Sequence, residues 1–111
     1  MTVWMIRYQV AEEGVAEVIR AVEAVFEAVR AKRPEGIRYA YYRRTGSTEL
    51  VATLELDGAE NPLFGIAAAR ELQATVAKWV VGEAPAPQPL DLLGAYGYDS
   101  LPEAARRPRT N

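Results

Sequence analysis

Three pairs of carboxylates stand close enough along the chain to suggest acid–base or metal chemistry. They are Glu12 with Glu13, Glu23 with Glu27, and Glu55 with Asp57. A glycosidase needs two carboxylates that face each other across the scissile bond, and a calcium or magnesium site needs several oxygen ligands around one point. The three pairs lie on an expected helix surface or at an expected strand end, where solvated charge explains them. Neither a glycosidase site nor a metal site is therefore predicted.

The other groups with chemical potential lack the partners that catalysis needs. The sequence contains no His and no Cys, which removes the usual proton shuttle, the usual zinc or haem-iron ligands, and thiol chemistry. Ser47 and Ser100 consequently have no His for a nucleophilic triad. Gly94 and Gly97 are spaced for a bulge or a strand end, not for a nucleotide-binding loop. We expect no metal and no cofactor.

Charge and hydropathy limit the possible partners. The formal net charge of -2 gives no broad positive field, and the only local basic cluster, Arg106, Arg107 and Arg109, lies at the end of the chain. Nucleic acid is therefore not expected as a partner. The first residues, MTVWMIRYQV, include an Arg and no small-residue cleavage site, and no apolar stretch reaches the ~18 residues of a membrane span. We expect a cytoplasmic protein with no membrane segment.

The elements that must position any site begin with a strand and a long helix. Residues 3–10 are rich in branched and aromatic types, which predicts a central strand. Between residues 12 and 32, apolar side chains recur at three- and four-residue steps, which predicts an amphipathic helix. Strands are predicted over residues 37–44 and 49–56, with a turn between them that makes a hairpin.

The second part of the chain predicts another helix and a last strand. Asn61 can cap free backbone amides, and Pro62 suits the first turn of a helix. A second helix is therefore predicted from there to about Val81. Residues 83–89 alternate Pro with small residues and are expected to form an extended connector, after which residues 90–98 are the candidate for the last strand.

Length and element order together predict one domain. The chain has 111 residues, half of them apolar and a quarter charged, which suits a single hydrophobic core. The order βαββαβ predicts an α+β, ferredoxin-like fold, with a four-stranded antiparallel sheet and both helices on one face. We expect this domain to cover residues 1–98 and a C-terminal tail to cover residues 99–111.

The face of the sheet that the helices leave bare is expected to carry apolar groups in either register. The alternating sets of the first strand are Val3, Met5, Arg7 and Gln9 against Trp4, Ile6, Tyr8 and Val10. A large exposed apolar surface usually marks an interaction site, and twofold pairing is the commonest way to cover one. We therefore expect a homodimer that pairs through its sheet faces. Arg7, Arg38 and Glu55 are expected on the paired face, as ion pairs between strands or across the dimer axis, or as plain surface ion pairs.

The chain resembles a known superfamily in its size, its element order, its aromatic first strand (VWMIRYQV), its long first helix and the Asn61-Pro62 start of its second helix. It is similar to the dimeric α+β barrel superfamily and, within it, to the antibiotic biosynthesis monooxygenase-like domains. The resemblance spans about residues 2–98 and rests on pattern. It implies paired sheets and a small-molecule cavity between sheet and helices. Some members oxidise aromatic polyketides without metal or flavin, whereas the axial His of haem-degrading members has no counterpart here.

The resemblance also implies candidate catalytic residues, matched by type and rough location. They are Asn61, Arg70, Trp79, Tyr39, Tyr41 and Arg7. Oxygenation without a metal needs the phenolic substrate as an electron-rich anion, so the protein must supply a base or a cation and a dry pocket. Each candidate also has a simpler structural interpretation: a helix cap for Asn61, an inner helix position for Trp79, packing for the tyrosines, and solvated or paired charge for Arg70.

Two functions remain open from the sequence. The first is a homodimeric small-molecule-binding domain that acts as a cofactor-independent monooxygenase on an aromatic or polyketide-like compound. It predicts a pocket of ~300 Å³ or more under the helices, faced by Arg70, Asn61 or Arg7. The second is a non-catalytic homodimeric binding or scaffolding module, whose core is filled by its own large side chains. Those side chains would be Phe26, Phe64, Trp79, Trp4 and Tyr39.

Overall fold

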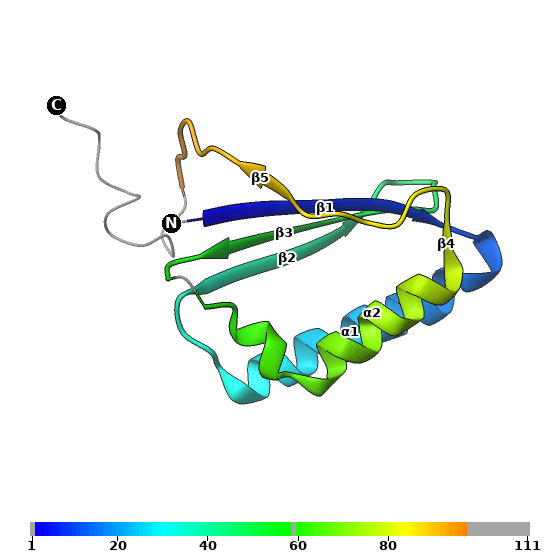
Figure 1. Ribbon diagram of the computed structural model, residues 1–111, viewed down its shortest axis with the longest axis horizontal. Coiled ribbons are helices and arrows are strands. Elements are labelled where there is room, and N and C mark those ends of the chain that lie inside the picture. The colour runs from blue at the N-terminus through cyan, green and yellow to red at the C-terminus, as the bar shows by residue number, and fades with distance from the viewer. Residues whose placement is uncertain (1, 59, 98–111) are drawn as a thin grey trace, which may run out of the picture.

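The computed structural model describes residues 2–58 and 60–97. Its elements (Figure 1) are β1 (Thr2–Val10), the 3₁₀ turn η1 (Glu12–Gly14), α1 (Val15–Lys32), β2 (Ile37–Arg43), β3 (Glu49–Leu56), the 3₁₀ turn η2 (Pro62–Gly65), α2 (Ala67–Trp79), β4 (Val80–Val81) and β5 (Gln88–Leu90). The tail expected at residues 99–111 lies outside the described residues.

The strands form one antiparallel sheet in the order β2-β3-β1-β4, and β5 also pairs with β1. β3 occupies one edge of β1. On its other edge, β4 pairs with Gln9 and Val10, while β5 pairs with residues 3–5. The fourth position of the sheet is thus divided between two short strands. Both helices cover one face of this sheet (Figure 1), which confirms the predicted ferredoxin-like α+β fold.

The last strand does not lie where the sequence pattern placed it. α2 ends at Trp79, and Val80–Val81 turn directly into the sheet as β4. β5 then begins at Gln88 and ends at Leu90, so the strand predicted over residues 90–98 is wrong across 91–97. Tyr98 lies outside the described residues. β5 was not predicted because it contains Pro89, which lacks a backbone donor and therefore argues against a strand. Proline is tolerated in a strand only at a sheet edge such as this one.

The strand register gives each sheet face its residues. The face toward the helices holds the buried side chains of Tyr8, Val10, Leu50, Ala52 and Leu56. The opposite face, called the open face below, holds the alternate positions. They are Val3, Met5, Arg7 and Gln9 of β1, Arg38, Ala40 and Tyr42 of β2, and Glu49, Val51, Thr53 and Glu55 of β3. The expected placement of Arg7, Arg38 and Glu55 on one face is thereby confirmed.

The core lies between the sheet and the two helices. Val18 and Val25 of α1 are fully buried, and Leu72 and Val76 of α2 complete the cluster. The start of α1 is fixed against the end of α2 at Gly14, where a Cβ would come within 2.2 Å of the Trp79 side chain. Only Gly fits at that contact. In residues 2–58 and 60–97, neither helix combines the length and the apolarity needed to cross a membrane.

Candidate functional site

Three tyrosines lie together between the sheet and the helices. Tyr8 comes from β1, and Tyr39 and Tyr41 come from alternate positions of β2, so all three side chains project from the helix-covered face. The Tyr8 and Tyr41 hydroxyls are hydrogen-bonded to each other. The Tyr8 and Tyr41 rings meet edge to face at 6.5 Å and 75°, and the Tyr39 and Tyr41 rings at 6.1 Å and 87°. We call these three residues the tyrosine cluster.

Phe26 of α1 covers one side of the tyrosine cluster. Its ring stacks on the Tyr39 ring with 4.9 Å between centroids and an interplanar angle of 12°. Arg30, one turn further along α1, holds its guanidinium carbon 6.0 Å from the centre of the Phe26 ring. An aromatic ring is therefore already accommodated face to face on Tyr39.

Burial keeps the tyrosine cluster protonated. It raises the pKa of Tyr39 to about 12, with a smaller contribution from Tyr8. Burial also raises the pKa of Tyr41, and the hydrogen bond with Tyr8 adds to this rise. For Tyr8, burial raises the pKa and the hydrogen bond with Tyr41 partly opposes it. At neutral pH these phenols are hydrogen-bond donors, not bases, and a buried donor can stabilise an oxyanion beside it.

Asn61 and Arg70 each make a hydrogen bond to the η2 turn that precedes α2. The Asn61 Oδ1 accepts a hydrogen bond of 2.9 Å from the backbone N–H of Leu63, which makes Asn61 the cap of η2. Arg70 Nη1 donates a hydrogen bond of 2.9 Å to the carbonyl oxygen of Phe64 in the same turn. Asn61 thus caps the η2 turn, and Arg70 joins that turn to α2.

Trp79 lies at the other end of α2 and is held by a carboxylate. Its Nε1 donates a 3.0 Å hydrogen bond to Glu17 Oε1 on α1, and Lys78 Nζ lies 3.4 Å from the same oxygen. The hydrogen bond from Trp79, followed by that from Lys78, lowers the pKa of Glu17. Trp79 therefore links the two helices. It is the last residue of α2, whereas Arg70 lies in the first turn of that helix and Asn61 precedes it.

Arg7 projects from the open face, on the opposite side of the sheet from the tyrosines. Its Nε lies 2.8 Å from Glu49 Oε2 on the neighbouring strand. The structure thus brings Tyr39 and Tyr41 into contact and gives Asn61 and Arg70 separate hydrogen bonds to the η2 turn. Trp79 lies at the far end of α2, and Arg7 lies on the opposite face of the sheet. Tyr8 was missed by the sequence reasoning. Its signal was its place in the alternating set with Trp4, Ile6 and Val10, which turned out to face the helices.

Two carboxylates of β3 are held in ion pairs on the open face. Glu49 lies 3.6 Å from Arg44 Nη1 as well as contacting Arg7, and Glu55 lies 3.5 Å from Arg38 Nη1. In the part of the chain that the structure describes, no three Asp or Glu side chains gather where they could hold a metal ion.

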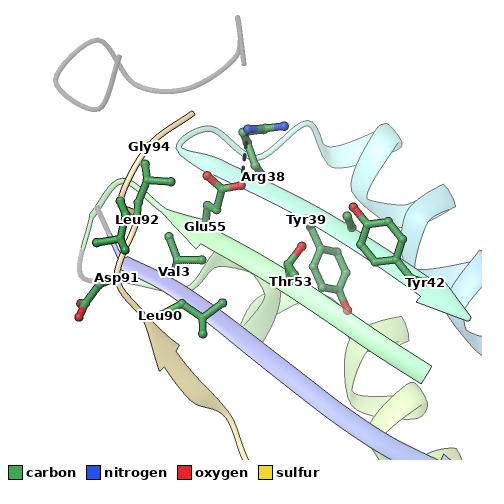
Figure 2. Close-up of a pocket in the computed structure, with 12 residues that line it drawn as sticks. Val3, Arg38, Tyr39, Tyr42, Thr53, Glu55, Leu90, Asp91, Leu92 and Gly94 are labelled. Carbon is green, nitrogen blue, oxygen red and sulfur yellow. Dashed lines mark ion pairs between the residues drawn. The ribbon is translucent and has the colours of Figure 1, made fainter. Parts of the chain in front are cut away.

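A pocket of about 380 Å³ lies on the open face, whereas the sequence reasoning expected one under the helices. Figure 2 shows its floor on β2 and β3 and its wall on the chain that leaves β5. The side chains that face it include Val3, Arg38, Thr53, Glu55, Leu90 and Leu92. The space under the helices is instead occupied by the tyrosine cluster and Phe26.

The comparisons with known proteins rest on structure. No protein-family profile and no curated protein matches this sequence. Among solved structures, the chain is similar to a candidate antibiotic biosynthesis monooxygenase of Nitrosomonas europaea, with a TM-score of 0.69 and 17% identity over 86% of this chain and 93% of that one. It is also similar to Rv0793 of Mycobacterium tuberculosis, with a TM-score of 0.64 and 17% identity over 85% and 96% of the two chains.

The chain is also similar to a third solved structure. It is a candidate antibiotic biosynthesis monooxygenase of Caulobacter crescentus, with a TM-score of 0.63 and 20% identity over 84% of this chain and 90% of that one. The chain therefore shares the ferredoxin-like α+β fold of these three solved structures. The resemblance drawn from the sequence is confirmed for the fold, and similarity at this level of identity extends no further than the fold.

Proposed function

We propose that this protein is a homodimeric small-molecule-binding domain that acts as a cofactor-independent monooxygenase on an aromatic compound. The observation that carries the proposal is the tyrosine cluster. The three phenols lie together between the sheet and the helices, and burial raises their pKa values, which makes the cluster a candidate functional site. Two structural neighbours are named as candidate antibiotic biosynthesis monooxygenases, which supports the same class of reaction.

In this proposal the substrate ring stacks on Tyr39, at the position that Phe26 occupies in the structure. The substrate releases its proton to solvent as it enters and binds as the anion, and the hydroxyl pair of Tyr8 and Tyr41 then donates a hydrogen bond to the anionic oxygen. A neutral donor stabilises that anion without giving up its proton, because its own pKa lies far above neutrality. The surrounding apolar side chains exclude water from the anion.

The electrons for the reaction come from the substrate. The substrate anion reduces O₂, one oxygen atom enters the ring as a carbonyl, and the other leaves as water with the remaining hydrogen of the oxidised carbon and a proton taken back from solvent. No external reductant is needed. In this scheme Tyr8, Tyr39 and Tyr41 contact the substrate, and of these only Tyr39 and Tyr41 were predicted from the sequence. Asn61 and Arg70 hold the η2 turn, and Trp79 joins the two helices.

The homodimer rests on the open face. Apolar side chains of three strands lie on it, and Tyr42 is 58% exposed. Ion pairs such as Arg7 with Glu49 lie among them and satisfy the charges within one chain. Pairing of two such faces would bury this surface, as twofold pairing commonly does.

A second candidate function is favoured by the filling of the space under the helices. Phe26 stacks directly on Tyr39, and Tyr8 is buried. A core filled in this way fits a non-catalytic homodimeric binding or scaffolding module. The two candidate functions differ in one requirement: the monooxygenase needs Phe26 to move away from Tyr39 so that a substrate ring can stack there, and the non-catalytic module does not.

The deciding experiment measures oxygen uptake by the purified protein with 1,8-dihydroxyanthrone in the presence of a metal chelator. Uptake above the rate without protein, reduced at least about tenfold in Tyr41→Phe, is the expected result, because loss of one oxyanion donor commonly costs that much or more. Phe26→Ala, which exposes Tyr39, should retain uptake. Uptake no faster than without protein, from protein that is folded by circular dichroism, would favour the non-catalytic module.

A further inference from the structure

The pocket on the open face has a polar floor built from neighbouring strands. Arg38 and Glu55 are directly opposite each other in β2 and β3, and their side chains form an ion pair with 3.5 Å between Nη1 and Oε2. Ala40 and Thr53 are the next such pair along the same face. Figure 2 shows the ion pair with the Thr53 hydroxyl further along the same strand. Donor and acceptor groups therefore stand side by side on this floor.

The opposite wall of the pocket is apolar. β5 pairs with β1 so that Leu90 lies opposite Val3, and both line the pocket with Leu92. Ala40 contributes only a methyl group to the floor, which leaves room above it. The volume of about 380 Å³ falls within the range of small-ligand sites, which hold an apolar body and a few oriented polar groups.

The charges of the pocket select against anions. Arg38 and Glu55 balance each other, and Asp91 at the rim adds one negative charge. A carboxylate or a sulfonate would meet two carboxylates and one guanidinium. A hydroxyl group suits the floor better, because it can donate to Glu55 and accept from Arg38 at once.

We propose that this pocket is a second binding site, separate from the tyrosine cluster, and that it takes a neutral hydroxylated aromatic compound. The hydroxyl lies at the Arg38–Glu55 pair, and the ring lies against Val3, Leu90 and Leu92. The sheet separates this site from the tyrosine cluster, because the two line opposite faces. In a homodimer paired through the open face, the ligand lies between the two sheets and strengthens their association.

The test is a titration of the full chain with 2-naphthol, followed by isothermal calorimetry and by the naphthol fluorescence. We expect saturable binding of one molecule per chain, and binding of naphthalene-2-sulfonate at least about tenfold weaker. Glu55→Gln should weaken 2-naphthol binding about tenfold, because a neutral amide replaces a charged acceptor. Ala40→Leu should abolish binding because the larger side chain fills the space above the floor.

Two control variants test whether 2-naphthol binds in this pocket or elsewhere on the protein. Val51→Leu enlarges a side chain of the open face outside the pocket and should bind 2-naphthol as the wild type does. Tyr41→Phe alters the tyrosine cluster and should also leave binding unchanged. Thr53→Val, a milder change in the floor, is expected to weaken binding severalfold and serves if Ala40→Leu does not fold.

The outcomes distinguish this proposal from the proposed function. Loss of 2-naphthol binding in Tyr41→Phe, with normal binding in Ala40→Leu, would place the ligand at the tyrosine cluster and overturn the second site. An absence of saturable binding to the wild type would also overturn it. Binding that is weakened or lost in Ala40→Leu, Thr53→Val and Glu55→Gln, but kept in Val51→Leu and Tyr41→Phe, supports the second site even if no oxygen uptake is found.

Discussion

Tyr8 and Tyr41 join their hydroxyl groups in a hydrogen bond although β3 lies between their strands. The residue of β3 that is directly opposite Tyr41 is Ala52, which is buried and carries only a methyl group. A larger side chain at Ala52 would stand between the two phenols. The contact therefore depends on a small residue in the central part of the sheet as much as on the tyrosines themselves.

The first prediction concerns the energy of this hydroxyl pair. Tyr8→Phe and Tyr41→Phe each leave one buried hydroxyl without its partner, so each should lower the free energy of unfolding by about 1 kcal/mol. The double variant should cost less than the sum of the two, by about 1 kcal/mol, because the partner is already gone. Urea denaturation of the four proteins measures this. Strict additivity would show that the two hydroxyls do not interact.

The second prediction concerns alkaline pH. The folded-state pKa of Tyr39 is about 12, above the ordinary value of 10.0 for a tyrosine. The folded protein thus holds this proton more tightly than the unfolded chain, and its contribution to stability is complete below pH 10 and lost between about pH 10 and 12. In Tyr39→Phe the slope of stability against pH in that window should be smaller. Thermal unfolding at several pH values tests this, and an unchanged slope would contradict it.

A spectroscopic measurement checks the same titration directly. Tyrosinate absorbs at longer wavelength than tyrosine, so the wild type should show a late rise near pH 12 that is reduced in Tyr39→Phe. An identical late rise in both proteins would mean that Tyr39 titrates with the exposed phenols.

The third prediction concerns the contact between Gly14 and Trp79. A Cβ at Gly14 would lie 2.2 Å from the indole, so Gly14→Ala should destabilise the protein by about 1–3 kcal/mol through overpacking. Gly65→Ala is the matched control, since nothing lies within 4 Å of the Cβ it would carry. Chemical denaturation compares the two. Adding Trp79→Leu to Gly14→Ala should recover part of the loss, whereas equal stability of the two Ala variants would contradict the contact.

Much of the fold could be predicted because its signals are local. The three- and four-residue spacing in α1 and the alternation in β1 need no knowledge of the partners they pack against. β4 and β5 could not be predicted in the same way. Two residues at Val80–Val81 are too few to show a period, and β5 forms because the edge of β1 accepts a Pro-containing strand.

The candidate site could be predicted from the sequence less completely than the fold. Tyr39 and Tyr41 could be chosen by residue type, but their contact with Tyr8 depends on the register of two strands across β3, which a single sequence leaves open. The pocket depends on where residues 90–94 pass beside the sheet, and that path is set by the pairing of β5. Asn61 was the exception, because its capping role follows from its place directly before Pro62.

The fourth prediction concerns Asn61. Asn61→Ala removes the acceptor for the Leu63 N–H and should lower the free energy of unfolding by about 1 kcal/mol, while Asn61→Asp should restore most of it. Oxygen uptake tests whether Asn61 does more than cap. If it only caps, both variants oxidise the anthrone at the wild-type rate under conditions where they are folded. Loss of uptake in both variants at full folding would instead indicate contact with the substrate.

The fifth prediction concerns pairing through the open face. Val51 lies on β3 between Arg7 of β1 and Tyr42 of β2, near the middle of that face. Val51→Lys would bring two uncompensated ammonium groups into a twofold contact, so the dimer dissociation constant should rise at least about tenfold. Ala24→Lys, at an exposed position of α1, adds the same charge on the helix side and should leave it unchanged. Sedimentation velocity over a range of concentrations measures both. An equal rise of the dissociation constant in both variants would mean that net charge, not the open face, controls association. A wild type that stays monomeric at every concentration would remove the homodimer from the proposed function.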